Sequence, residues 1–349
     1  MKNNDYSQIE VGIIGKSFGM LPDGKEVFSY TLRNKRGMEL SVINYGATIT
    51  SLKIPISDAK KIDVVLGFET LEDYINSFDL PNATYFGTVV GRYAGRINNA
   101  EFSLNNETIS LSKNHGTHQI HGGKIGFSRK YWEVKSISNE ENPSMTLEYT
   151  SAENEENYPG ELAISVTYTL TEKNELDVRF QATTSEDTIV NLTQHSYFNL
   201  EGHGATISNH RLAVNASRIL ETDSELIPTG DFIDLENHPH DFSTSKECPK
   251  SIDTTFVIDS YLAAMLFCEK TNLKMTAFTN QPAVHIYVGG NCFNQIKGKE
   301  NADYHPTSGI CFEAQNFPDA PNHSHFPSAV LKKGAAYNHH TTFKFENLK

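Results

Sequence analysis

The stretch from Ser308 to Ala320 ends an expected strand with a carboxylate, Glu313, that could act as a general base. Apolar residues occupy alternate positions up to Ala314, and successive side chains of a strand point to opposite faces. Glu313 would then project beside Gln315, away from the apolar residues and just before a turn at Pro318. A carboxylate held at a strand end among aromatic residues suits proton transfer. On this segment alone, a solvated strand-end glutamate is the simpler interpretation.

A histidine, His195, lies in the middle of a second expected strand, from Val190 to Leu200. One parity of this strand is largely apolar and the other is polar, with Asn191, Thr193, His195 and Tyr197 in alternate positions. This pattern is typical of a strand that faces a ligand, although a lone histidine is more often a hydrogen-bonded core residue. Because imidazole exchanges a proton near neutral pH, His195 is a candidate general acid.

Three histidines, His115, His118 and His121, follow one another at a spacing of three. The glycines around them disfavour a helix, and in a loop this spacing does not define a tetrahedral set of zinc ligands. No cysteine or carboxylate at zinc-site spacing follows nearby, so we expect no metal. We expect His121, held by the turn at Gly122-Gly123, to hydrogen-bond a substrate.

Two further segments carry charged residues that could bind a ligand. Arg92 and Arg96 lie four residues apart among glycines, and a guanidinium is a rigid fork of donors that suits paired hydroxyls or a carboxylate. Structural ion pairs are the alternative, which we favour for Arg92. The segment lacks the glycine and lysine pattern of a phosphate loop. Asp253 enters a later strand, where aspartate is usually a turn residue but could accept hydrogen bonds from sugar hydroxyls.

The elements that must position these groups are mostly strands. Alternation of apolar residues is clearest over Leu162–Leu170 and Leu176–Ala182, which a polar turn joins, and it recurs near residues 40, 102, 145, 273 and 284. Half-buried strands joined by short turns are typical of a sandwich or barrel. Leu71–Phe78 and Ser260–Phe267 are predicted to be short helices. With no internal repeat or low-complexity linker, we expect an all-β fold with one domain over residues 1–349.

Composition excludes several classes of function. The 349 residues carry a formal charge of −13, which disfavours nucleic-acid binding. No apolar run approaches the roughly 18 residues of a membrane span, and Met1–Gly12 lacks the apolar core of a signal peptide. The cysteines lie far apart and are expected to be reduced, which favours the cytoplasm; they are Cys248, Cys268, Cys292 and Cys311.

Taken together, these segments resemble the aldose 1-epimerases, also called galactose mutarotases. Six motifs occur in the family's order and approximate spacing: G-R-Y-A-G-R-I, I-H-G-G, N-L-T-Q-H-S-Y-F-N-L, I-D-T-T-F, C-F-E-A-Q-N-F-P-D-A and F-P-S-A-V-L-K-K-G. The resemblance runs from about Phe18 to Phe345 and so covers nearly the whole chain.

The resemblance implies one large antiparallel β-sandwich, the galactose mutarotase-like supersandwich, with a sugar bound in an open cleft across one sheet. It further implies a monomer or homodimer that acts on a small molecule, a free aldohexose such as galactose or glucose, without a cofactor. Carried over residue by residue, it makes Glu313 the catalytic base and His195 the catalytic acid, and it gives the binding of the sugar to Arg96, His121 and Asp253. Gly95 and Thr254 depart from the family pattern and bear on the sugar preference.

Four alternatives stay open at this point. An epimerase of hexose 6-phosphates would need a cationic pocket, for which Arg92, Lys124 and Arg129 are candidates. A glycoside hydrolase would need two carboxyl groups about 5–9.5 Å apart, which Glu313 and Asp253 could supply. A sugar-binding or regulatory protein would keep the cleft without turnover, and a zinc protein would use some of the 14 histidines.

Overall fold

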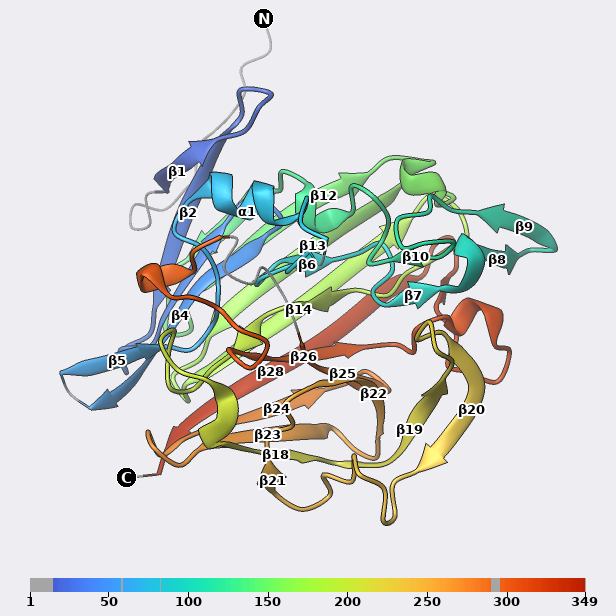
Figure 1. Cartoon of the computed structure of the whole chain (residues 1–349). Helices are drawn as coiled ribbons and strands as arrows, with labels where there is room; N and C mark the ends of the chain where they lie inside the picture. Colours follow the sequence, from blue (N-terminus) through green and yellow to red (C-terminus); the bar gives the residue numbers. More distant parts are fainter. Residues whose placement is uncertain (1–14, 58, 82, 290–295, 349) are drawn as a thin grey trace, which may run out of the picture.

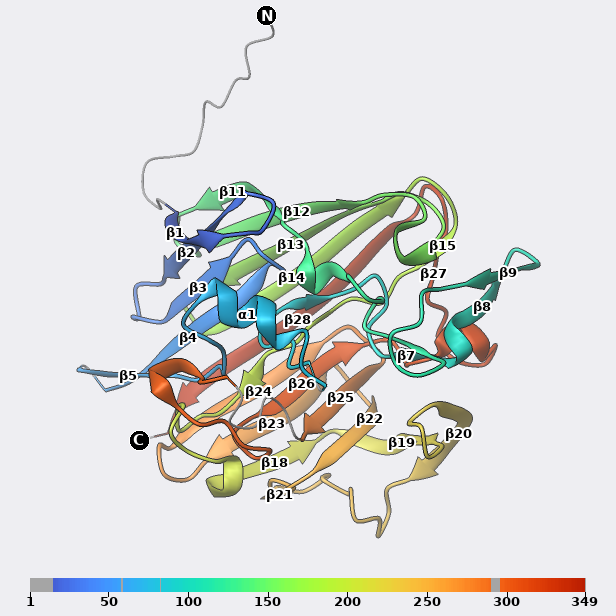
Figure 2. The same cartoon turned by 45° about the horizontal axis from the view of Figure 1, so that its top comes forward.

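The computed structural model describes residues 15–57, 59–81, 83–289 and 296–348, and antiparallel strands dominate it (Figures 1 and 2). This confirms the predicted all-β class. The largest sheet has nine strands, in the order β11 (Glu133–Ser138), β12 (Ser144–Ser151), β13 (Leu162–Leu170), β14 (Glu175–Thr184), β28 (Ala336–Asn347), β24 (Leu273–Thr279), β23 (Leu262–Cys268), β18 (His210–Val214) and β21 (Lys246–Glu247). The long strand β28, red in Figures 1 and 2, runs across the molecule between β14 and β24.

Two smaller sheets pack against the first. A six-stranded sheet has the order β17 (Tyr197–Phe198), β26 (Ile310–Gln315), β25 (Ala283–Val288), β22 (Ile252–Ile258), β19 (Ala216–Thr222) and β20 (Pro228–Asp234). A five-stranded sheet follows the chain through β1 (Lys16–Met20), β2 (Glu26–Arg33), β3 (Glu39–Ile43), β4 (Thr48–Ser57) and β5 (Lys60–Asp63).

Short ladders and helices fill the connections. The ladders pair β6 (Val89–Val90) with β16 (Thr193–Gln194), β7 (Arg96–Ile97) with β10 (Gln119–Ile120), β8 (Glu101–Leu104) with β9 (Glu107–Ser110), and β15 (Thr188–Ile189) with β27 (Val330–Leu331). The 3-10 helices are Asn98–Ala100, Phe127–Arg129, Glu155–Asn157, Ile207–Asn209, Lys299–Asn301 and Ala320–Asn322. Within the described ranges, the α-helix is α1 (Leu71–Ser77).

One of the two predicted helices is confirmed and the other is wrong. Helix α1 begins after Thr70, whose side chain accepts a hydrogen bond from the Asp73 backbone N–H, the usual role of an N-cap threonine. Ser260–Phe267 instead overlaps strand β23, which pairs on both sides with β18 and β24. A short apolar run does not distinguish helix from strand by itself, and pairing with neighbouring strands decides here.

The predicted hairpins follow from their turn residues. Strands β13 and β14 pair in register up to Leu170 and Leu176, as the alternation of the two segments predicts. Between β8 and β9, Asn105 and Asn106 adopt φ values of 52° and 67°. Asparagine tolerates this left-handed region better than most residues, which is why it suits two-residue hairpin turns.

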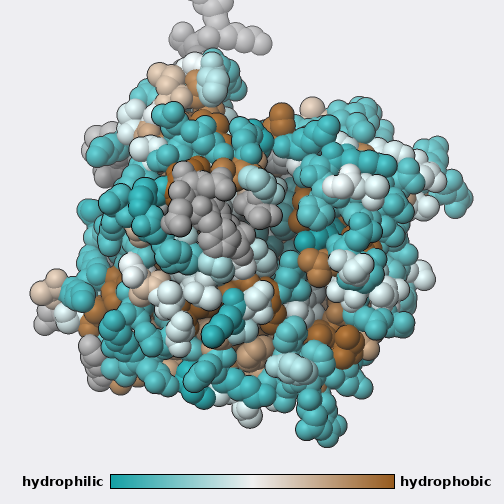
Figure 3. All heavy atoms as spheres, viewed as in Figure 1, coloured by the Kyte–Doolittle hydropathy of each residue, from teal (hydrophilic) through white to brown (hydrophobic). Residues whose placement is uncertain are grey.

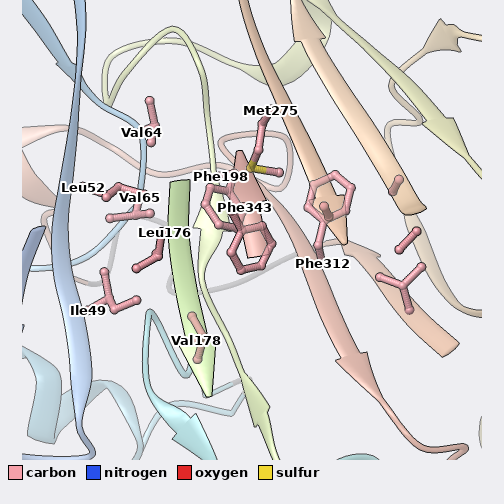
Figure 4. Close-up of a cluster of buried hydrophobic side chains, with 14 of the residues drawn as sticks. Ile49, Leu52, Val64, Val65, Leu176, Val178, Phe198, Met275, Phe312 and Phe343 are labelled. Atoms are coloured by element: carbon pink, nitrogen blue, oxygen red, sulfur yellow. The ribbon is translucent and has the colours of Figure 1, made fainter. Parts of the chain in front are cut away.

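A continuous core lies between the sheets and fixes the strand that carries Glu313. Its members come from all three large sheets, and Figure 4 shows part of it around Phe198, Phe312 and Phe343. The rings of Phe198 and Phe343 are 5.0 Å apart and those of Phe198 and Phe312 are 6.1 Å apart. Because Phe312 precedes Glu313 on β26, burial of its ring turns the carboxylate to the opposite face. Each such ring contributes about 1.5–3 kcal/mol on burial.

Arg92 has a structural role, as we favoured, but among the described residues its guanidinium donates to carbonyl and hydroxyl oxygens and not to the carboxylate of the predicted ion pair. Its side chain is buried, and Nη1 donates to the carbonyl oxygens of Pro159 and Gly160, at 2.8 Å each, while Nη2 donates to Ser151 Oγ at 2.7 Å. The single tryptophan, Trp132, is fully buried and donates through Nε1 to the Phe127 carbonyl oxygen. Both residues therefore hold the fold together.

The hydrophilic surface and the free cysteines agree with the predictions made from the composition. The face in Figure 3 is mostly hydrophilic, with hydrophobic residues in small groups. Cys248, Cys268 and Cys311 are free thiols, whereas Cys292 and the segment Met1–Gly12 lie outside the described residues. No helix in the described part of the chain is long and apolar enough to cross a membrane.

Candidate active site

A cleft of about 520 Å³ lies along the face of the six-stranded sheet that is turned away from the core. Strands β22, β25 and β26 form its floor. The structure brings all five predicted site residues to this cleft, although they come from segments far apart in the chain: Arg96, His121, His195, Asp253 and Glu313. The floor also presents His285, Tyr287 and Gln315, and Tyr85 lines a wall.

Glu313 and His195 form a close pair at the bottom of the cleft. His195 Nε2 lies 3.4 Å from Glu313 Oε1, and their side chains are only 5% and 4% exposed. One group is a carboxylate and the other an imidazole, so together they can accept a proton at one place and donate one at another. Their burial excludes most bulk water from this exchange.

The segment around His195 is not the single strand that the sequence predicted. It divides into β16, which pairs with β6, and β17, which pairs with β26. His195 lies in the break, where its N–H donates to the Thr88 carbonyl oxygen and its own carbonyl accepts from the Gly87 N–H, both at 2.9 Å. Asn191 donates to the Ala94 and Asn316 carbonyl oxygens, so it ties loops together and does not face the cleft.

Aromatic rings hold the His195 imidazole in place. The rings of Tyr85 and Tyr197 stack on it with centroid distances of 5.8 and 5.2 Å, and Cys311 Sγ lies 3.7 Å from Nδ1. Burial lowers the pKa of His195, and the Glu313 carboxylate opposes this effect without cancelling it. Once protonated, His195 is therefore a stronger acid than a histidine in water.

His121 points into the same cleft from the turn after β10. It adopts a φ of 52°, and its Nδ1 accepts a hydrogen bond from the Gly95 N–H at 3.3 Å, which assigns the ring hydrogen to Nε2. A side chain at Gly122 would lie within 1.9 Å of the Gly91 carbonyl oxygen, so the predicted glycine turn is required. Burial, followed by the charge on His195, lowers the pKa of His121 well below its usual value.

Arg96 and Asp253 form an ion pair within the lining of the cleft. Arg96 Nη2 lies 3.5 Å from Asp253 Oδ2, and Arg96 is positioned on β7 opposite Ile120 of β10. Burial raises the pKa of Asp253, but the hydrogen bond and charge of His285 and the charge of Arg96 outweigh it, so the net pKa is lowered. Asp253 is thus an acceptor of hydrogen bonds and not a proton donor, which argues against a glycoside hydrolase pair with Glu313.

Sequence reasoning missed His285, which lies directly opposite Glu313 on the neighbouring strand. Its Nε2 is 2.9 Å from Asp253 Oδ1 and its Nδ1 is 2.8 Å from Thr255 Oγ1. A signal was present, because the apolar set at Val284, Ile286 and Val288 leaves His285 on the opposite parity of the strand. Tyr85 had no such signal, since it lies in a loop with a φ of 50°.

The three loop histidines His115, His118 and His121 are not brought together as one set of donors. His118 accepts from the Asn99 N–H and lies 3.5 Å from Glu225, so the three loop histidines do not form one set. Among the described residues, the group of donor atoms that approach one another within 4.8 Å is His121, His195 and Glu313. A carboxylate and two imidazoles are also the types of group that transfer protons and form hydrogen bonds.

The cationic candidates for a phosphate pocket are separated. Arg92 is buried in the fold as described above and does not reach the cleft, whereas Lys124 and Arg129 line its rim. Arg129 lies 3.6 Å from Asp79 and over the ring of Phe78. Two rim cations, one of them paired, make a weaker phosphate site than the three that the sequence allowed.

Comparisons with known proteins point to one family. Residues 29–344 match the family model described as aldose 1-epimerase. A galactose mutarotase from Sus scrofa is 35% identical, over 96% of this chain and 99% of its own length. An aldose 1-epimerase from Haemophilus influenzae is 33% identical, over 93% of this chain and 97% of its own length.

Solved structures show the same fold. The crystal structure of an aldose epimerase homologue from C. elegans superposes with a TM-score of 0.84 at 28% identity, and the match covers 92% of this chain and 100% of that one.

Proposed function

Because the chain belongs to the aldose 1-epimerase family, we propose that Glu313 and His195 carry out the proton transfers of its reaction, with free hexoses such as galactose and glucose as substrates. The enzyme interconverts the α and β anomers of an aldose. The single observation that carries the residue assignment is the 3.4 Å approach of His195 Nε2 to Glu313 Oε1 at the bottom of the cleft.

The reaction requires the bond between C1 and the ring oxygen to break and form again. Glu313, as the carboxylate, removes the proton from the C1 hydroxyl while protonated His195 gives a proton to the ring oxygen. The open-chain aldehyde rotates about its C1–C2 bond and closes with its other face exposed. During closure the Glu313 carboxyl group gives its proton to the C1 oxygen, while His195 takes a proton back from the hydroxyl group that becomes the ring oxygen. Each transfer is typically worth ~10²–10⁴-fold in rate.

The remaining predicted residues bind the sugar in this proposal. Asp253 accepts hydrogen bonds from hydroxyl groups, Arg96 donates them, and His121 donates through Nε2 near the reacting atoms. Because Arg96 and Asp253 are 3.5 Å apart at their nearest atoms, a pair of adjacent hydroxyls can bind to both. These contacts hold C1 and the ring oxygen between Glu313 and His195, which is the positioning that makes proton transfer efficient.

A sugar-binding protein without turnover explains the site less well. Binding alone does not need a buried acid and base in contact, and burying ionisable groups is costly unless they are paired. We also propose a cytoplasmic location, which the free thiols of Cys248, Cys268 and Cys311 support.

Polarimetry of freshly dissolved α-D-galactose and α-D-glucose tests the proposal. The wild-type enzyme is expected to reach the same final rotation faster than the uncatalysed reaction, and the ratio of the two rates ranks the sugars. Glu313→Gln is expected to abolish most of the acceleration. If neither sugar is accelerated, the free-hexose proposal fails and hexose 6-phosphates, which the Lys124 and Arg129 rim could contact, become the next substrates to test.

A further inference from the structure

His285 occupies a position between the two carboxylates of the cleft. It lies opposite Glu313 on β26 and opposite Thr255 on β22. Opposed residues of an antiparallel pair have Cβ atoms roughly 4.5–5.5 Å apart, so the imidazole lies beside the Glu313 carboxylate. Both of its nitrogens are engaged, one with Asp253 Oδ1 at 2.9 Å and the other with Thr255 Oγ1 at 2.8 Å.

These contacts suit a positively charged ring. Nε2 must donate to reach the Asp253 carboxylate, which only accepts, and a threonine hydroxyl can accept from Nδ1–H at the same time. Asp253 then receives a cation on each oxygen, His285 on Oδ1 and Arg96 on Oδ2. The charges along the cleft therefore alternate in sign from Arg96 through Asp253 and His285 to Glu313.

Resting on the proposed function, we propose that His285 is a positioning residue of this enzyme: as an imidazolium between the two carboxylates of the cleft, it holds the Asp253 carboxylate in place for sugar binding. It acts through Asp253 and transfers no proton to the sugar.

The surroundings of His285 support a charged state. The titratable and charged groups that act on it or line the cleft around it are Asp253 from β22, Glu313 from β26, Arg96 from β7, His195 and His121, with Tyr287 on its own strand. Burial lowers the pKa of His285, but the hydrogen bond to Asp253 and the charges of Asp253 and Glu313 outweigh it, so that the net pKa is raised. The pKa values of the neighbouring histidines, His195 and His121, are instead lowered.

Two substitutions separate the charge of His285 from its hydrogen bond. In His285→Gln the amide can still donate to Asp253 but carries no charge, whereas His285→Leu loses both. His285→Leu is expected to raise KM on the order of tenfold because Asp253 loses its partner, with a smaller rise in His285→Gln and little change of kcat in either variant. Because the pKa of His285 is raised by Asp253 and Glu313, the difference in KM between wild type and His285→Gln should be present below that pKa and shrink as the pH rises through it.

The experiment measures pH profiles of kcat/KM and kcat by polarimetry on galactose for wild type, His285→Gln, His285→Leu and the control His210→Gln. His210 is a fully buried histidine, hydrogen-bonded to the Leu200 N–H and not part of the cleft. His210→Gln is expected to keep the wild-type KM at each pH. Circular dichroism of each variant shows that the measured protein is folded.

The outcomes are distinct. A raised KM in both His285 variants, larger in His285→Leu and with kcat kept, supports the inference. KM values that superimpose on wild type overturn it, as does a change that His210→Gln reproduces. If wild type itself does not accelerate mutarotation, the proposed function fails. If His285→Leu does not fold, the pH dependence of KM in wild type and in His285→Gln decides.

Discussion

Replacing Glu313 by glutamine tests the proposed chemistry most directly. The amide keeps nearly the shape of the carboxylate but cannot take a proton from the C1 hydroxyl. A general base typically contributes ~10²–10⁴-fold, which corresponds to about 2.7–5.5 kcal/mol of barrier. Because Glu313 lies on β26 between paired strands and beside the Phe312 ring of the core, we expect the fold to persist and KM to change little.

The substitution should also change how the residual activity depends on pH. In the wild type, the Glu313 carboxylate raises the pKa of His195 against the larger lowering effect of burial. Removing the carboxylate takes away the largest effect that opposes burial, so the pKa of His195 falls further. The residual activity, which needs protonated His195, should then decline at lower pH than in the wild type.

The assay is polarimetry of fresh α-D-galactose from about pH 5 to 9, with a second glutamate as the control. Glu346→Gln changes the same functional group on β28, where Glu346 pairs with Lys274 at 2.8 Å outside the cleft, and should leave kcat/KM unchanged. A folded Glu313→Gln enzyme that keeps more than about a tenth of the wild-type kcat/KM would refute the assignment of Glu313 as the base.

Three further substitutions test the acid and the scaffold. His195→Asn should lower kcat by ~10²–10⁴-fold, and combining it with Glu313→Gln should cost little more in the same assay, because the two act as one unit. Arg92→Met should lower the free energy of unfolding by at least about 2 kcal/mol, because buried carbonyl oxygens lose their donors; urea unfolding followed through buried Trp132 fluorescence measures this, and an unchanged midpoint would contradict it. Burial raises the pKa of Asp63, but Lys299 at 2.9 Å and nearby His203 outweigh it and lower the net pKa. This contribution is full above the unfolded pKa of about 3.9 and is lost as the pH falls toward the folded value, so Asp63→Asn should be less stable at pH 7 but lose less stability in acid.

The strands were predictable because each is buried on one face. Alternation located β13, β14 and the β8–β9 hairpin, and it placed Glu313 and Gln315 together away from the core. Alternation did not identify a strand where pairing with other strands decides the structure. The run at Ser260–Phe267 became a strand only because β18 and β24 lie on either side of it, and no short-range pattern carries that information.

The five residues that line the candidate cleft were predictable one by one, but how the fold brings them together was not. Each predicted residue had a structural alternative when considered with its own segment, and Arg92 in fact took that alternative. The break at His195 arises because the chain leaves β6 for β26 as its pairing partner, which a periodic pattern does not express. Likewise His285 lies opposite Glu313 on the neighbouring strand, a relation that is set by register and that the sequence alone does not express.

The register of three neighbouring strands places a histidine between the two carboxylates of the cleft. Asp253, His285 and Glu313 come from β22, β25 and β26 in order across the sheet, and Arg96 closes the series at Asp253. In our proposal His285 is a cation that holds the Asp253 carboxylate. Burying this charge is costly, and the hydrogen bonds to both ring nitrogens offset that cost. Since these side chains share the cleft face, the core residues on the opposite face of the same strands, among them Phe256, Ile286 and Phe312, fix the spacing of the whole series.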